Sequence, residues 1–221
     1  MEIKQFEWDV VDSNSWLITE YNHGLLIDTV DSLKLYEELQ KLDSLSIILT
    51  HSHFDHIIGL NRIKELRPVV RVISTKLCSK NMGNKFKNMS SSATAFMVFY
   101  SGKNDVEIDS FICDPADETF ENEYEFTWCG HQIELLAFCG HSEDSLIAIV
   151  DGIKMFSGDT ILSIPTVTRF PSGSTTRFWE MDMVKLRELN CEMMVYPGHG
   201  EPGRLKNMLI VNKKPERYRK R

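Results

Sequence analysis

Residues 50–56, with the sequence THSHFDH, hold three of the chain's seven histidines and an aspartate within seven positions. They directly follow LSIILT, an apolar run of the kind that forms a strand buried on both faces. Because side chains alternate along a strand, His51 and His53 are expected to project in the same direction just beyond it. Asp55 and His56 then lie where the chain turns into the next helix. Imidazoles this close together need partners when they are buried, and a metal ion is the partner that this set favours.

One such segment cannot complete two coordination shells, so more ligands are expected at the ends of other predicted strands. His141 follows IELLAFCG, Asp159 follows KMFSG and His199 follows MVYPG. Each lies beside a glycine, which lets the backbone turn sharply close to a site. The two remaining histidines, His23 and His131, fall in predicted hairpin turns and are interpreted as ordinary turn or surface residues.

The order of the predicted elements is typical of helices that cover a sheet. Apolar residues at helical spacing predict helices over residues 32–42, 57–67 and 175–189. Short apolar runs bounded by turn residues predict strands over residues 6–11, 15–20, 24–29, 45–50, 69–75, 124–128, 131–138, 145–152, 153–159 and 193–200.

Residues 76–125 form a long insertion with one or two predicted helices. A polar stretch, an aromatic cluster and an acidic segment follow one another in it. One interpretation is a surface excursion with a small core of its own. The other is a lid that contacts substrate, for which the candidate side chains are Met89, Phe96, Phe99 and Tyr100.

Composition narrows the class of protein. The 221 residues suffice for one substantial core, so we expect a single domain over residues 1–221. A net charge of −7 disfavours a nucleic acid or an anionic membrane as partner. The start, MEIKQFEWDVV, does not read as a signal peptide, and the five scattered cysteines favour reduced thiols. We therefore expect a cytoplasmic protein with a small-molecule substrate and no membrane partner; a homodimer stays open.

The chain resembles the metallo-β-lactamase superfamily in its complete set of metal-binding positions, which here are His51, His53, Asp55, His56, His141, Asp159 and His199. The resemblance runs from GLLIDT to YPGHGEP in the family's order and approximate spacing. It implies an α+β fold, a four-layer αββα sandwich in which helices flank two mixed β-sheets. The metals of this family lie in a shallow groove at one edge of the sheets.

The resemblance also implies a role for each ligand. The first metal would be held by His51, His53 and His141. The second would be held by Asp55, His56 and His199, with Asp159 as the bridge. Two zinc ions per chain are expected, with iron or manganese open, because imidazole and carboxylate ligands accept several metals. Such a pair implies a hydrolase that uses a metal-bridging hydroxide, with Asp55 also catalytic as the acceptor that orients the hydroxide.

Ligand identity places the resemblance within the superfamily. A glutamate in place of His53 would resemble the di-iron flavoproteins, and a cysteine or serine in place of Asp159 would resemble the true β-lactamases. Glyoxalase II-like hydrolases, lactonases and RNase Z-like phosphodiesterases are therefore most similar. There are departures: Asp28-Thr29-Val30 replaces Asp-Thr-Gly, and Phe138-Cys139-Gly140-His141 replaces Thr-Pro-Gly-His. Little chain follows His199, so the helical domain with which glyoxalase II binds glutathione is expected to be largely missing.

Three activities remain open at this point. The first is hydrolysis of a small thioester, ester or lactone, and the second is phosphodiester cleavage as a phosphodiesterase or nuclease. The third is a mononuclear iron enzyme similar to the persulfide dioxygenases. Arg169 and Arg177, on either side of FPSG, are candidate substrate-binding residues, because an arginine pairs well with a carboxylate or phosphate. The basic tail over residues 204–221 is either a solvated helix or a strip that attracts phosphate.

Overall fold

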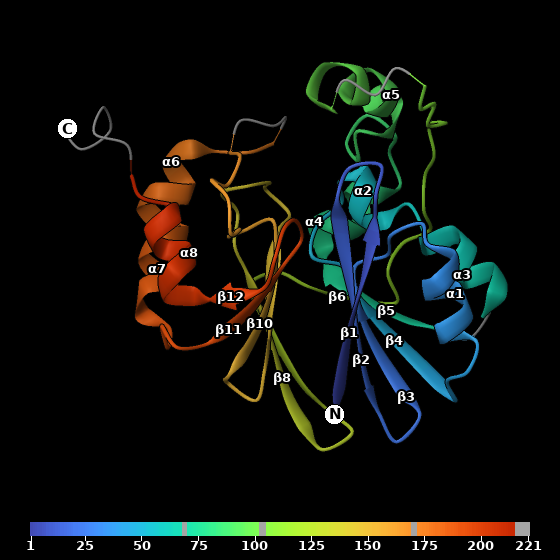
Figure 1. Cartoon of the computed structure of the whole chain (residues 1–221), viewed down its shortest axis with the longest axis horizontal. Helices are drawn as coiled ribbons and strands as arrows, with labels where there is room; N and C mark the ends of the chain where they lie inside the picture. Colours follow the sequence, from blue (N-terminus) through green and yellow to red (C-terminus); the bar gives the residue numbers. More distant parts are fainter. Residues whose placement is uncertain (68–69, 102–104, 169–171, 215–221) are drawn as a thin grey trace. The chain divides into compact units, whose positions relative to one another are not determined.

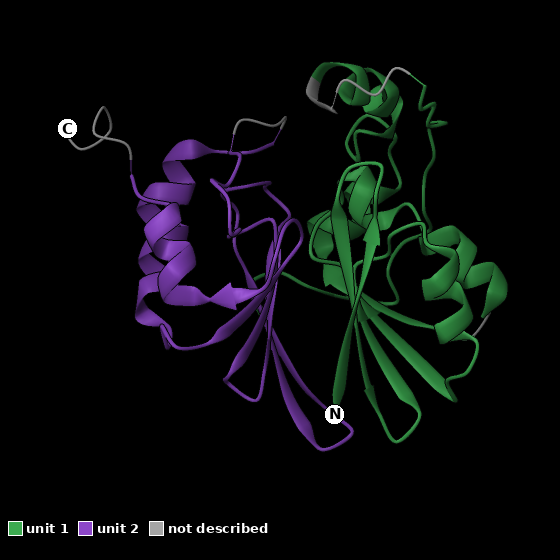
Figure 2. Ribbon diagram, viewed as in Figure 1, with its two compact units in different colours: residues 1–123 green, residues 124–221 purple. Residues whose placement is uncertain are grey.

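A computed structural model describes residues 1–67, 70–101, 105–168 and 172–214 (Figure 1). The chain divides into two compact units, residues 1–123 and 124–221 (Figure 2). Each unit contains one six-stranded sheet with both parallel and antiparallel pairs. The prediction of a single domain over the whole chain stays a prediction.

The sheet of the first unit runs in sequence order. Its strands are β1 (Glu2–Trp8), β2 (Ser13–Glu20), β3 (His23–Ile27), β4 (Ser44–Ile48), β5 (Arg71–Thr75) and β6 (Glu118–Phe120). The first three pair antiparallel, and β3 to β6 pair parallel. The connections carry α1 (Leu33–Leu39), α2 (Phe54–Ile57) and α3 (Leu60–Leu66).

Strand β4 positions the histidine cluster. It lies inside the sheet between β3 and β5, and Ile47 and Ile48 are fully buried, as the apolar run predicts. The chain leaves β4 through residues 49–53 and enters α2 at Phe54. The cluster therefore lies at the carboxyl end of a parallel strand, where the connecting loops of α/β units gather functional side chains.

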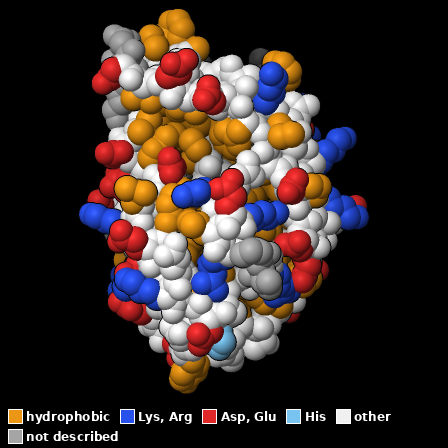
Figure 3. Space-filling model, turned by 90° about the vertical axis from the view of Figure 1, so that its right-hand side faces the viewer, with side chains coloured by type: hydrophobic (Ala, Val, Ile, Leu, Met, Phe, Trp, Pro, Cys, Tyr) orange, Lys and Arg blue, Asp and Glu red, His pale blue; other side chains and the backbone are white. Residues whose placement is uncertain are grey.

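The insertion has more regular structure than its composition predicts. It contains α4 (Lys76–Met82), η1 (Ser90–Ser92), α5 (Ala93–Phe96), the π-helix η2 (Met97–Ser101) and β6. Part of it packs on α2, since the Phe96 ring meets Phe54 edge-on at 6.1 Å, and Met89 is buried. Phe99, in contrast, is 84% exposed, and the side chain of Tyr100 lies outside the described part. On the face in Figure 3, hydrophobic side chains gather in the upper part, while acidic and basic ones alternate lower down.

The sheet of the second unit has the order β12-β11-β10-β9-β8-β7. Its strands are β7 (Glu123–Trp128), β8 (His131–Ala137), β9 (Leu146–Val150), β10 (Lys154–Gly158), β11 (Met194–Pro197) and β12 (Gly203–Arg204). The helical segments are α6 (Thr175–Arg177), the π-helix η3 (Phe178–Asp182), α7 (Met183–Glu188) and α8 (Leu205–Val211). The predicted helix over residues 175–189 is thus helical, with a π turn inside it.

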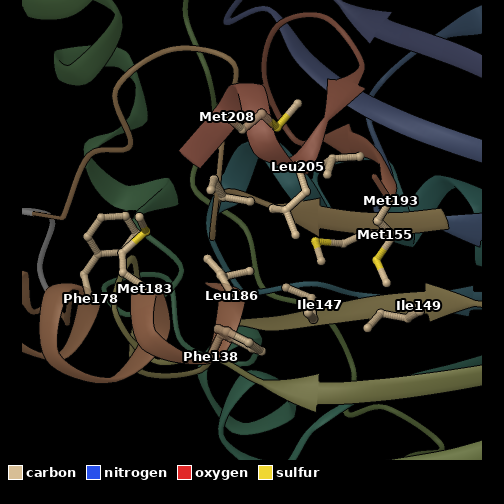
Figure 4. Packing of buried hydrophobic residues seen from close by; sticks show 12 residues of the cluster. Phe138, Ile147, Ile149, Met155, Phe178, Met183, Leu186, Met193, Leu205 and Met208 are labelled. Carbon is tan, nitrogen blue, oxygen red and sulfur yellow. The ribbon is translucent and has the colours of Figure 1, made fainter. Parts of the chain in front are cut away.

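A buried apolar cluster joins the helices of this unit to its sheet (Figure 4). Phe178, Met183 and Leu186 come from η3 and α7, and Met155 comes from β10. Their burial on one side of α7 matches the amphipathic pattern of the sequence. No helix in the described part of the chain has both the length and the apolar character to cross a membrane.

Candidate metal centre

The first unit carries four of the predicted ligands on one short segment. His51 and His53 lie in the loop after β4, and Asp55 and His56 lie in α2. All four are buried, with exposed fractions from 0% for His51 to 9% for Asp55. The backbone of α2 is fixed as well, because the Ser13 hydroxyl donates to the carbonyl oxygen of Asp55 at 3.1 Å.

The buried carboxylate of Asp28 organises this segment from the end of β3. Its Oδ1 accepts the backbone N–H of Thr50 at 2.7 Å, and its Oδ2 accepts the Thr50 hydroxyl at 2.7 Å. The same Oδ2 lies 2.9 Å from His56 Nδ1, which donates to it. Such carboxylate–histidine pairs orient metal ligands and fix their tautomer.

These contacts determine which ring nitrogen carries the proton in two imidazoles, those of His51 and His56. Because the Thr50 hydroxyl donates its hydrogen bond to Asp28 Oδ2, it accepts a hydrogen bond from His51 Nδ1 at 3.0 Å. His51 and His56 therefore both carry their proton on Nδ1 and present the lone pair of Nε2 as a metal ligand. Assignment of the protons follows from the hydrogen-bond network.

The remaining distances within this segment are those of ligand pairs. His51 Nε2 lies 3.1 Å from His53 Nδ1, and His56 Nε2 lies 3.6 Å from Asp55 Oδ2. Two ligands ~2.0–2.1 Å from one zinc ion in tetrahedral geometry are ~3.4 Å apart. The donor atoms are therefore spaced to hold ions without a large rearrangement.

The second unit brings its three predicted ligands together at the ends of its strands. His141 follows the turn after β8, Asp159 follows β10 and His199 follows β11. Asp159 Oδ2 lies 3.5 Å from His141 Nε2 and also 3.5 Å from His199 Nε2. One carboxylate oxygen thus lies at ligand-pair distance from two imidazoles, which suits a ligand of one ion as well as a bridge between two.

His141 is oriented by the loop that follows Asp159. Its Nδ1 donates to the carbonyl oxygen of Val167 at 2.7 Å, which again leaves Nε2 for a metal. The loop is tied to α8 by Asn212: Oδ1 accepts the N–H of Thr166 at 2.7 Å, and Nδ2 donates to the carbonyl of Leu162 at 2.9 Å.

Replacement of Asn212 by alanine is expected to lower the free energy of unfolding by about 1–3 kcal/mol, because it leaves the buried loop groups without these partners. Asn190→Ala is the matched control, since Asn190 also accepts a backbone N–H, that of Glu192 at 3.0 Å, but is exposed. Urea denaturation of both variants gives the comparison. Equal stability of the two would show that Asn212 does not hold the loop.

The departures from the family pattern have local explanations. Asp28 itself makes the turn, in the left-handed conformation at φ 58°, which aspartate tolerates better than most residues. Gly59 supplies the close approach, because a Cβ there would lie 2.5 Å from the Val30 carbonyl oxygen. Cys139 is half-buried, and burial, reinforced by Asp182, raises the pKa of its thiol.

The structure describes only one of the two arginines that were predicted to bind substrate. Arg169 lies outside the described residues, and Arg177 is an exposed residue of α6. Sequence reasoning did not identify Asp28 and Asn212 as supports of the ligands. Asp28 had a signal, its place at the end of a predicted strand, whereas nothing in the sequence marks Asn212.

A family model described as the metallo-beta-lactamase superfamily matches residues 8–199. The chain belongs to the metallo-β-lactamase superfamily. The match includes all seven predicted ligands, and each of the seven is a candidate metal ligand in the structure. The coarse prediction of a metallo-hydrolase of this superfamily is therefore supported, and the donor set of imidazoles and carboxylates fits zinc, iron or manganese.

Three known proteins resemble this chain, one in sequence and two in structure. The chain is 26% identical over 199 residues to the hydroxyacylglutathione hydrolase of Photobacterium profundum, in a match that covers 85% of this chain but 62% of that relative. Among solved structures, the BLEG-1 B3 metallo-beta-lactamase is 21% identical, with a TM-score of 0.78 and coverage of 96% of this chain and 98% of that chain. TTHA1623 in a di-iron-bound form has a TM-score of 0.72 at 21% identity, and the match covers 95% of this chain and 98% of that chain. The predicted α+β class with the metallo-β-lactamase fold is thus confirmed.

Proposed function

We propose that this superfamily member is a dinuclear metal-dependent hydrolase of a small thioester, ester or lactone. The observation that carries the proposal is the number of candidate ligands, seven histidine and aspartate side chains, among which Asp159 Oδ2 lies 3.5 Å from both His141 Nε2 and His199 Nε2. Those distances suit ligands of one ion or of two, and a pair is favoured because seven candidate ligands exceed the four that one tetrahedral zinc ion takes. Zinc is the proposed metal and the cytoplasm the proposed location.

In this proposal the ligands of both units act on one pair of ions. His51, His53 and His141 would hold the first ion. Asp55, His56 and His199 would hold the second, and Asp159 would bridge. When bound, the pair would supply an ionised water near neutral pH, since bound metal lowers the pKa of water to about 7.

The chain's own groups would do the rest. Asp55 would accept a hydrogen bond from the attacking hydroxide and so orient it toward the substrate. Asp28, through His56 and Thr50, would keep the imidazoles in the ligating tautomer. No serine or cysteine nucleophile is required by this scheme.

Charge supports a small substrate rather than a nucleic acid. The net charge is −7, and binding a phosphate backbone normally calls for clustered lysine and arginine. On the face in Figure 3, acidic and basic side chains are interspersed and form no continuous basic strip. A glutathione thioester, as the name of the Photobacterium relative implies, is one candidate substrate within the proposed class.

Metal analysis with a substrate panel tests the proposal. We expect about two zinc ions per chain and turnover of thioesters or lactones above that of bis(p-nitrophenyl) phosphate. Protein stripped with a chelator should lose the activity and regain it with zinc. About one iron per chain with oxygen consumption would instead indicate the dioxygenase reaction. Preference for the phosphodiester would indicate the phosphodiesterase.

A further inference from the structure

Asp182 is a buried carboxylate that the proposed reaction does not use. It is the last residue of η3 and only 3% exposed. Phe178 and Met183, on either side of it in the chain, belong to the apolar cluster of the second unit (Figure 4). A charged group at such a place needs hydrogen bonds to offset the loss of water.

Those hydrogen bonds come from the turn that carries His141. Asp182 Oδ2 accepts the backbone N–H of Gly140 at 2.7 Å, and the N–H of Cys139 donates to the carboxylate as well. Gly140 is held by a second contact as well, because its carbonyl oxygen accepts the N–H of Ser174 at 2.8 Å. The peptide groups just before His141 are therefore fixed from the helical segment over residues 174–182.

Close packing reinforces this arrangement. A Cβ at Gly140 would lie 2.4 Å from Asp182 Oδ2 and 2.6 Å from the Phe178 Cα, so only glycine fits. A Cβ at Gly173 would lie 2.4 Å from the carbonyl oxygen of His141. The backbone at Gly140 and His141 is thus closely packed on both sides by the protein itself, without a metal ion.

Burial of Asp182 disfavours its charged form. Burial raises the pKa of Asp182 to about 6 from its ordinary 3.8, although the two backbone hydrogen bonds, Lys185 and Arg177 act in the opposite direction. A raised pKa means that the folded state favours the protonated acid. The stabilising contribution is complete below about pH 3.8 and is lost as the pH rises through about 6.

We propose that Asp182 is a positioning residue that fixes the turn over residues 139–141, so that His141 is aimed at the first metal before the metal binds. The metal is that of the proposed function, on which this part of the inference rests. The fixed turn itself does not depend on a metal. Groups that support a ligand in this way typically change metal affinity ~10–100-fold when removed.

The test compares Asp182→Ala and Asp182→Asn with the wild type. Glu180→Gln is the matched control, because Glu180 is an exposed acid of the same π turn. The first measurement is amide exchange of Gly140 in metal-free protein, which should be at least ~10-fold faster in Asp182→Ala. The second is competition for zinc with a chelator, in which Asp182→Ala should bind at least ~10-fold more weakly. Asp182→Asn, which keeps one acceptor oxygen, should recover part of both effects.

Exchange as slow as in the wild type, in a folded Asp182→Ala protein, would overturn the inference. So would unchanged zinc affinity with accelerated exchange, because the turn would then be fixed without consequence for the ligand. If the alanine variant does not fold, the asparagine variant decides by the same two measurements. A wild type that binds no zinc would refute the proposed function, while the exchange measurement would still decide whether Asp182 fixes the turn.

Discussion

Replacement of Asp55 by alanine is expected to lower turnover at least ~100-fold in protein that still carries metal, the scale seen when one pre-organised electrostatic group is lost. Asp55 would act both as a ligand of the second ion and as the acceptor that orients the attacking water. Its Oδ2 lies 3.6 Å from His56 Nε2, and its backbone is held by Ser13, so alanine removes the carboxylate without releasing α2.

The measurement is kcat with the best substrate of the panel, with metal content determined on the same sample. Asp43→Ala is a suitable control, since Asp43 is an acid of the same unit outside the site, in the turn before β4. Turnover like that of the wild type in metal-loaded Asp55→Ala would show that the proposed catalytic role is wrong. A fall in kcat that follows metal content in direct proportion would leave Asp55 as a ligand only.

The sequence predicted the parts of the site that depend on periodicity. A two-residue repeat places His51 and His53 on one side of the chain beyond β4, and their rings meet edge-on with centroids 4.6 Å apart. Glycines beside His141, Asp159 and His199 correctly indicated turns at strand ends. These inferences need only local geometry, which is why they could be made from the residues alone.

The supports of the ligands could not be predicted in the same way. Asn212 reaches a loop 46 residues earlier in the chain, and Asp182 reaches Gly140 at a separation of 42. Such contacts depend on how α7 and α8 pack on the sheet, which no local pattern encodes. Strand β6 was missed because three residues, Glu118–Phe120, are too few to show alternation.

The second large effect is expected for Asp28→Asn. Asparagine has the same shape as aspartate and also tolerates the left-handed backbone at φ 58°, so the turn should remain. Its amide NH₂, however, donates where the carboxylate accepted. If the amide oxygen stays with the N–H of Thr50, the NH₂ faces the Thr50 hydroxyl and His56 Nδ1.

The change from an acceptor to a donor at residue 28 would reverse the tautomers of His56 and His51. His56 Nδ1 would become an acceptor, and its proton would move to Nε2, the proposed ligand atom. The Thr50 hydroxyl would accept from the amide and donate to His51 Nδ1, which moves the second proton to Nε2 as well. We therefore expect zinc affinity to fall ~100-fold, the upper end of the range for ligand-supporting carboxylates.

Nitrogen-15 NMR of the histidine rings in metal-free protein reports the tautomers directly, and chelator competition gives the affinity. Thr50→Val is the informative companion, because it removes the relay to His51 but leaves the direct contact of Asp28 with His56. It should alter one ring and weaken zinc less than Asp28→Asn does. Unchanged tautomers in Asp28→Asn would mean that the proton positions are set by the ligands facing one another rather than by Asp28. The buried carboxylate would then only support the turn after β3 and link it to the loop after β4.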